Sequence, residues 1–211
     1  MHPLSDGGRS FFRSPPHGLP EKESQMPNLK KITVIVAGAA LLSTGAFATT
    51  KHNPMVGGAA MYPTKTIVEN AVNSKDHTTL VAAVKAAGLV ETLSGPGPFT
   101  VFAPTNAAFA KLPAGTVETL VKPENKAMLT SILTYHVVAG KMSAAMLAKN
   151  AAAHGGKATL TTVQGEPLVV SKGPGKSWML TDAKGGTAKI TIADVNQSNG
   201  VIHVIDSVLM P

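Results

Sequence analysis

The C-terminal segment 201–209 is the feature that most constrains the fold, because it is apolar on both of its faces. Its valine and isoleucine content is typical of a β-strand. Side chains alternate along a strand, so Val201 and Ile205 lie on one face while Ile202 and Val204 lie on the other. A strand that is apolar on both faces is buried on both. The segment therefore predicts a central strand with a layer of structure on each side.

Helical patterns occupy the first part of the domain and strand patterns the last. Apolar residues recur at helical spacing, or follow a capping residue, in six segments: 66–73, 78–87, 105–112, 114–121, 123–134 and 143–149. Alternating or β-branched residues indicate strands in six others: 99–103, 158–163, 167–171, 178–181, 189–195 and 201–209. This separation of helices from strands is typical of the α+β class.

The N-terminal part of the chain indicates export. Residues 1–25 are rich in proline and glycine and poor in apolar side chains, so we expect a disordered or non-native extension. From Met26 onward, two lysines, the apolar run 32–42 and small residues ending at Ala48 follow the layout of a signal peptide. The run is shorter than the roughly 20 residues that span a bilayer, which disfavours the alternative of a membrane anchor. We therefore predict a signal peptide over 26–48, cleavage after Ala48 and a biological start at Met26.

The chain after the predicted cleavage site is weakly basic and contains no cysteine. Residues 49–211 carry fourteen lysines, nine acidic residues and no arginine, a net charge of +5. The lysines are scattered and arginine is absent, which disfavours nucleic-acid recognition. Without cysteine there is no disulfide framework and no thiolate metal site. Prolines and glycines in 49–64 predict a flexible leader before a domain over 65–211.

The last predicted strand holds three polar residues of the kinds used in catalysis, His203, Asp206 and Ser207. His203 and Asp206 are three positions apart, so their side chains point to opposite faces of a strand and cannot form a dyad. His203 and Ser207 share a face, but four residues of strand separate them by roughly 13 Å, which exceeds hydrogen-bond reach. We therefore expect a buried, hydrogen-bonded structural role for His203 and no catalytic site.

A second histidine lies on an apolar helical stripe. Leu129, Ile132, Leu133 and His136 follow helical spacing, so the ring of His136 is expected to face the core. Tyr135 is expected at the rim of the same cluster, with its hydroxyl hydrated or hydrogen-bonded. The histidines after the predicted cleavage site show no metal-binding spacing, and we predict no metal and no cofactor.

Three segments together resemble the fasciclin domain family. They are Gly97–Leu112 (GPFTVFAPTNAAFAKL), Asn199–Pro211 (NGVIHVIDSVLMP) and the tetrad Tyr135, His136, Val137, Val138. The resemblance extends from about Lys65 to Pro211. It implies a wedge or sandwich of about seven strands packed with a bundle of short helices.

The resemblance also implies roles for individual residues. The tetrad Tyr135, His136, Val137 and Val138 matches a motif that has been linked to adhesion in this family, which makes it the candidate binding motif. Thr105, Asn106, His203 and Asp206 match positions of the two longer blocks, where we expect structural roles. For Asn106 the expected role is to satisfy backbone groups at the turn after Pro104.

Two functions follow as expectations. The first is a secreted or periplasmic, non-catalytic protein that binds an extracellular protein, a cell-surface polymer or a second copy of itself. The second is a carrier that holds a lipid or pigment in an apolar crevice between helices and sheet. A hydrolase would require an acid in contact with His136 inside an open cleft.

The export signal makes a prediction about the mature N-terminus. When the gene is expressed in a bacterium with the coding sequence for residues 1–25 retained, we expect the exported protein to begin at Thr49, because small residues precede that bond. N-terminal sequencing of the exported and unprocessed forms measures this. An unprocessed precursor that begins at Met1 would contradict the assignment of the start to Met26.

Overall fold

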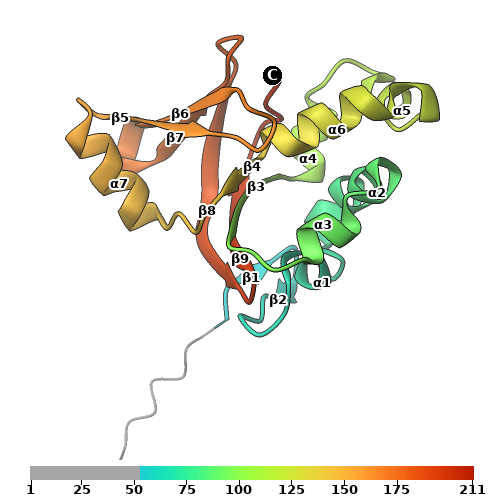
Figure 1. Ribbon diagram of the computed structural model, residues 1–211, viewed down its shortest axis with the longest axis horizontal. Coiled ribbons are helices and arrows are strands. Elements are labelled where there is room, and N and C mark those ends of the chain that lie inside the picture. Colours follow the sequence, from blue (N-terminus) through green and yellow to red (C-terminus); the bar gives the residue numbers. More distant parts are fainter. Residues whose placement is uncertain (1–52) are drawn as a thin grey trace, which may run out of the picture. The chain divides into compact units, whose positions relative to one another are not determined.

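Strands β3 (Phe99–Pro104) and β9 (Gly200–Ile205) pair in parallel inside a seven-stranded sheet in the computed structural model, which describes residues 53–211. The strand order is β4-β3-β9-β8-β7-β6-β5, and every other neighbouring pair is antiparallel (Figure 1). The remaining strands of the sheet are β4 (Val137–Ala139), β5 (Lys157–Thr161), β6 (Pro167–Lys172), β7 (Trp178–Thr181) and β8 (Thr187–Gln197). The central position of β9 and its complete burial confirm the prediction from its two apolar faces.

The sheet curls until its two outer strands meet. Val138 forms an isolated antiparallel bridge with Thr162, just after β5. The backbone N–H of Val163 also donates a hydrogen bond to the carbonyl of Val137 over 2.7 Å. The result is a nearly closed barrel, in which these contacts shorten the unpaired edges that could pair with other chains.

Six of the α-helices within residues 53–211 lie on one side of the sheet, and the last lies on the other side, against β5 and β6 (Figure 1). The helices are α1 (Ile67–Ala71), α2 (Thr78–Ala87), α3 (Val90–Ser94), α4 (Asn106–Ala110), α5 (Thr116–Leu120), α6 (Lys126–Tyr135) and α7 (Ala144–Ala153). Short 3-10 turns lie at Lys75–His77, Pro123–Asn125 and Pro174–Lys176. The expected α+β class and the seven strands are confirmed, with the strands forming one curled sheet.

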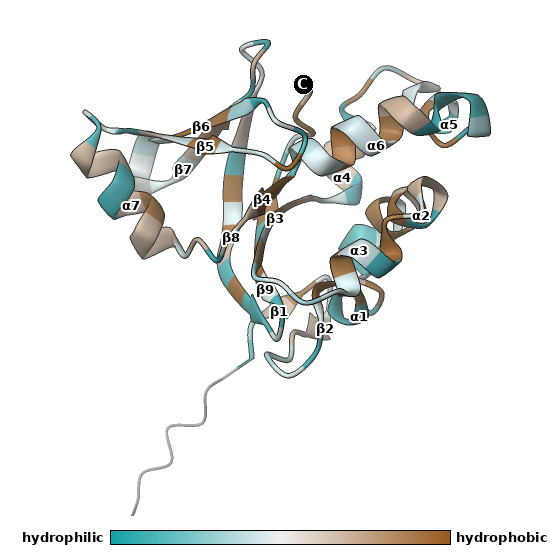
Figure 2. Cartoon of the chain, viewed as in Figure 1, coloured by the Kyte–Doolittle hydropathy of each residue, from teal (hydrophilic) through white to brown (hydrophobic). Residues whose placement is uncertain are grey.

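Two apolar cores lie on the two faces of β3 and β9. The helix-side core holds Val101, Ile202 and Val204 together with buried residues of α1, α2, α3 and α6. The barrel core holds Phe102 and Ile205 together with residues of β5, β6, β7, β8 and α7. In Figure 2 the brown, hydrophobic colour runs along β3 and along the sides of the helices that face it. The same two strands therefore support both cores.

Several local predictions match the structure closely. Helix α2 begins and ends at the predicted residues, and Gly88 ends it in the left-handed conformation at φ 76°. The Thr105 hydroxyl accepts a hydrogen bond from Ala108 N, which makes Thr105 the N-cap of α4. The last strand is shorter than predicted, because β9 ends at Ile205 and turns away before Leu209.

The prediction of a flexible leader over 49–64 is wrong for its described part, residues 53–64. Strands β1 (Met55–Val56) and β2 (Ala59–Ala60) form a small hairpin there. Val56 and Met61 are buried in the helix-side core, so the apolar side chains outweigh the proline and glycine content. The predicted extension 1–25, the signal peptide 26–48 and residues 49–52 lie outside the described residues.

One asparagine connects three separate parts of the fold. The side chain of Asn199, in the β8–β9 turn, accepts a hydrogen bond from Ile67 N at the start of α1 over 3.0 Å. Its amide nitrogen donates to the carbonyls of Leu93 over 2.8 Å and Gly95 over 3.0 Å, at the end of α3. One neutral side chain thus satisfies backbone groups of two helix ends that would otherwise lack partners.

We expect the substitution Asn199→Ala to lower the free energy of unfolding by about 3 kcal/mol, because it leaves several part-buried backbone groups without partners. Asn196→Ala, near the end of β8, is a matched control that removes only one local bond, to Asp194 O. We expect that control to change stability by less than about 1 kcal/mol. Urea unfolding of the three proteins measures the difference, and equal losses would refute the role of Asn199.

Candidate functional site

The tetrad Tyr135, His136, Val137 and Val138 lies where α6 ends and β4 begins, and all four side chains are buried. Helix α6 runs toward the barrel in Figure 1, and β4 turns along the sheet directly after it. A partner therefore cannot reach these side chains from the surface. Each member of the tetrad instead holds a different part of the scaffold.

Tyr135 joins the end of α6 to the strand half of the domain. Its hydroxyl donates a hydrogen bond to the carbonyl of Pro167 over 2.9 Å and accepts one from Ala183 N over 3.1 Å. Burial raises the pKa of the phenol above its ordinary value. The prediction of a rim position is wrong, because the ring is fully buried in the barrel core. The helical spacing correctly predicts that His136 faces the core. It cannot predict that Tyr135 enters the barrel core, because the barrel is formed by strands elsewhere in the chain.

His136 faces the core, as the helical spacing predicts. Its Nδ1 lies 2.8 Å from the carbonyl of Ile132, and its Nε2 accepts a hydrogen bond from Leu209 N over 3.1 Å. The first contact requires a hydrogen on Nδ1 and the second a lone pair on Nε2, so the ring is neutral. Burial lowers its pKa from 6.5 to about 4. The imidazole ties α6 to the C-terminal segment.

Val137 and Val138 act through their backbones. They pair with Val101 and Thr100 of β3 on one side. On the other side they form the contacts to Thr162 and Val163 that close the barrel. The tetrad is therefore the seam at which α6, β4 and the two outer strands of the sheet meet.

His203 and Asp206 lie apart, in agreement with the strand parity. The His203 ring stacks on Phe102 with centroids 5.6 Å apart, its Nε2 donates to Met142 O over 2.8 Å, and its Nδ1 accepts from Asp194 N over 3.2 Å. Burial also lowers the pKa of His203. Both ring nitrogens are occupied, so the ring has a structural role.

The Asp206 carboxylate is bound to different groups. It accepts hydrogen bonds from Lys189 N over 2.8 Å and from the Ser207 hydroxyl over 3.2 Å, and lies 3.7 Å from Lys111 Nζ. These contacts fasten the end of β9 to β8 and to α4, and none of them reaches His203.

Asn106 forms hydrogen bonds with residues much more distant in the chain than the sequence predicts. Its side chain accepts a hydrogen bond from Thr79 N over 3.0 Å and donates to Lys75 O over 2.8 Å and to the Thr78 hydroxyl over 2.9 Å. Thr78 and Thr79 belong to the first turn of α2, and Lys75 belongs to the 3-10 turn just before it. The N-cap residue of α2, His77, makes no side-chain capping bond. Asn106 therefore caps a helix 27 residues before it.

His77 is a buried polar residue that the sequence reasoning missed. Its Nδ1 lies 2.9 Å from the Ser74 hydroxyl, and its Nε2 has no hydrogen-bond partner within residues 53–211. Burial lowers its pKa. A cavity of about 10 Å³ beside it has room for one water molecule. The isolated histidine carried no periodic signal that marked it as buried.

An apolar cavity lies next to the tetrad, between the helices and the sheet. Its volume is about 40 Å³, and its lining includes His136 and Val137 with residues of α1, α2, α3 and β3. Lys85 is the one charged residue of this lining. The position matches the expected apolar crevice, but ligand pockets usually measure roughly 300–1,000 Å³. In this conformation the cavity admits only a small apolar group.

The described residues contain neither a cluster of metal ligands nor a membrane-spanning helix. Within 53–211, no three side chains of histidine, aspartate or glutamate come close enough together to hold a metal ion. No helix in this part of the chain has the length and apolar character needed to cross a bilayer.

The neutral, buried His136 predicts a loss of stability in acid. The unfolded chain takes up a proton near pH 6.5, whereas the folded protein resists it down to about 4. Stability is therefore lost as the pH falls through this window, by about 3 kcal/mol from this residue. Urea unfolding of the wild type and of His136→Gln at pH 6.5 and at pH 4 measures this loss. Between these two pH values, the free energy of unfolding of the variant should fall by about 3 kcal/mol less than that of the wild type.

The control for this experiment is His154→Gln, because the side chain of His154 is exposed. This variant should keep the acid sensitivity of the wild type. If His136→Gln keeps it as well, protonation of His136 does not drive the loss. The other buried histidines, His77 and His203, also lower the stability as the pH falls, and they do so in all three proteins.

Comparison with known proteins agrees with this architecture. The Fasciclin domain matches residues 75–211. The chain is 47% identical over 180 residues to protein sll1483 of Synechocystis, an alignment that covers 85% of this chain and 92% of that protein. It is 43% identical to immunogenic protein MPB70 of Mycobacterium bovis, covering 67% of this chain and 66% of that protein. It is 38% identical to cell surface glycolipoprotein MPB83 of the same organism, covering 74% and 64%.

A solved structure shows the same fold. It is a FAS1 domain pair from the insect cell adhesion molecule Fasciclin I, with a TM-score of 0.61 and 19% identity, covering 70% of this chain and 51% of that one. At this identity the likeness extends to the fold alone. The match of the Fasciclin domain over most of the chain and the identity to the curated relatives carry the assignment further: this chain belongs to the fasciclin domain family.

Proposed function

We propose that this protein is an exported, non-catalytic binding protein. It acts at or outside the cell surface by binding an extracellular protein or a cell-surface polymer. The observation that carries the proposal is the inward orientation of the tetrad, in which the polar atoms of Tyr135 and His136 bond to backbone groups. The motif thereby supports the scaffold and leaves binding to the outer surface. A cell surface protein among the relatives, MPB83, supports the same location.

The state of the histidines supports a non-catalytic role. A general base needs an accessible lone pair within reach of a substrate proton. In His136 and His203 both ring nitrogens are engaged by backbone groups, and both rings are buried. The hydrolase alternative required an acid against His136 in an open cleft, and the contacts of that ring are backbone groups instead.

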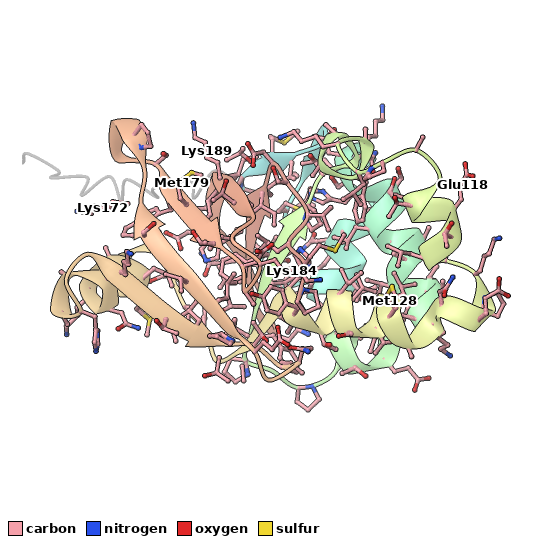
Figure 3. The ribbon with its side chains drawn as sticks, turned by 90° about the horizontal axis from the view of Figure 1, so that it is seen from above. Glu118, Met128, Lys172, Met179, Lys184 and Lys189 are labelled. Carbon is pink, nitrogen blue, oxygen red and sulfur yellow. The ribbon has the colours of Figure 1, made fainter. Side chains whose placement is uncertain are left out.

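The charge of the surface supports attraction to cells. Lys172, Lys184 and Lys189 are exposed over the strand half of the domain, whereas Glu118 and Met128 lie over the helical half (Figure 3). The three lysines form no ion pair with any described residue. Scattered positive charge of this kind adds a salt-dependent attraction to anionic cell surfaces.

A second candidate function is the carriage of a small apolar ligand, because the cavity beside His136 and Val137 is almost entirely apolar. A lipid or pigment would require α1, α2 and α3 to move away from α6, since the present volume is about 40 Å³. Native mass spectrometry of the exported protein tests this candidate. A retained apolar ligand supports a carrier, and a mass equal to that of the chain alone rejects it for the purified protein.

Adhesion is predicted to depend on exposed groups beside the tetrad. Val163, bonded through its backbone to Val137, exposes 50% of its surface, and Val72 on the helical side exposes 52%. Beads coated with the exported protein should be retained on bacterial cell envelopes and on extracellular matrix protein. Val163→Asp should reduce this retention with little change in melting temperature, and the matched variant Val72→Asp should not.

Two further variants separate binding from folding. Leu147→Asp places a charge in the barrel core and gives an unfolded control. His136→Gln, measured at a temperature where it is folded, should adhere like the wild type. Retention of wild-type beads no better than that of the Leu147→Asp beads would refute the proposed function.

A further inference from the structure

We propose that a polar groove at the β8–β9 turn binds a neutral saccharide chain. This inference rests on the proposed function and adds to it a second binding place, for a cell-surface polymer of one class, beside the exposed contact at Val163. The groove lies at the end of the sheet near β1 and β2, away from the tetrad's contacts at the C-terminal segment (Figure 1). Figure 2 shows the hydrophilic colour at this end of β8.

The groove consists of two adjoining hollows of about 470 and 630 Å³. Both are lined by Lys141, Gln197 and Ser198, so the two hollows adjoin along these three residues. Together they exceed the volume of a usual small-ligand pocket, which is roughly 300–1,000 Å³. The groove is therefore large enough for several linked sugar rings.

The floor of the groove is held rigidly. Gly97 and Gly200 lie so close to the backbones of Asn199 and Phe99 that neither position admits a side chain. Asn199 bonds this turn to α1 and α3, and Gln197 is buried and accepts a hydrogen bond from Asn70. Because the floor is already ordered, a ligand that binds there does not have to offset the entropic cost of ordering it.

The lining matches the chemistry of a neutral sugar. Its two charged residues, Lys141 and Asp194, have opposite signs, so the groove has no net charge from its side chains. The hydroxyls of Ser94 and Ser198 form no hydrogen bond within residues 53–211, and the amide oxygen of Asn196 forms none there either. Such groups donate to and accept from sugar hydroxyls. Prolines 54, 63, 96 and 98 add apolar surface for the C–H faces of sugar rings.

Other ligand classes fit this groove less well. An extended peptide adds to a sheet at an unpaired strand edge, but β8 and β9 each have a partner on both sides. A polyanion requires several basic groups, and the lining contains one lysine balanced by one aspartate. An apolar ligand would leave the hydroxyl and amide groups without partners.

Isothermal titration of the exported protein with maltohexaose, cellohexaose, laminarihexaose and mannohexaose tests the proposal, with heparin as an anionic comparison. We expect at least one neutral hexasaccharide to bind with a Kd below about 5 mM. Because the ligand is uncharged, the affinity should change less than about twofold between roughly 50 and 500 mM salt. Binding of heparin alone, weakened by salt, would overturn the proposal in favour of a polyanion.

Ser198→Trp fills the junction of the two hollows without removing a described side-chain hydrogen bond, and should weaken saccharide binding by about tenfold or more. Thr159→Trp, at an exposed position of β5, is the matched control and should bind like the wild type. Unchanged binding by Ser198→Trp, or no binding of any hexasaccharide, refutes the groove. Bead adhesion measured alongside separates the two proposals, because adhesion without saccharide binding refutes the groove and leaves the proposed function intact.

Discussion

The parallel pairing of β3 with β9 is the constraint on which the rest of this structure depends. The two strands come from distant parts of the chain, and their register places Phe99 opposite Gly200 and Pro104 opposite Ile205. Their side chains alternate between the helix-side core and the barrel core. Apolar burial on either face therefore stabilises the same pair, and loosening the pair would open both cores at once.

Neutral polar side chains complete the connections that apolar packing leaves unspecified. Asn106 and Asn199 bond to the ends of helices that precede them by many residues. His136 and His203 bond to backbone groups through both ring nitrogens. Burying a neutral group with satisfied hydrogen bonds costs far less free energy than burying a charge. These residues give the layers a defined relative position, and the histidines make that position sensitive to acid.

This use of polar residues explains how a family motif can matter for binding while being inaccessible. Tyr135 and His136 determine where α6 ends, and Val137 and Val138 determine where the barrel closes. The exposed residues beside the seam, such as Val163, depend on that closure for their position. Loss of adhesion after a change in the tetrad therefore measures the scaffold, and only changes at exposed positions measure contact. The groove at the β8–β9 turn depends on the same strand pair.

The sequence by itself determined those features whose causes are local. Helix α2, its glycine cap, strand β7 and the opposite orientations of His203 and Asp206 all follow from periodicities and caps that span a few residues. The resemblance to the fasciclin family added the number of strands.

Only the tertiary structure decided the features that join distant segments. It placed Tyr135 inside the barrel, extended the reach of Asn106 to α2, packed residues 53–64 into the core and formed the groove at the β8–β9 turn. The spacing of side chains predicts which face of an element each one occupies, but not which other element packs against that face. The packing partner depends on pairing between strands that are about a hundred residues apart in the chain, and no local sequence pattern specifies that pairing.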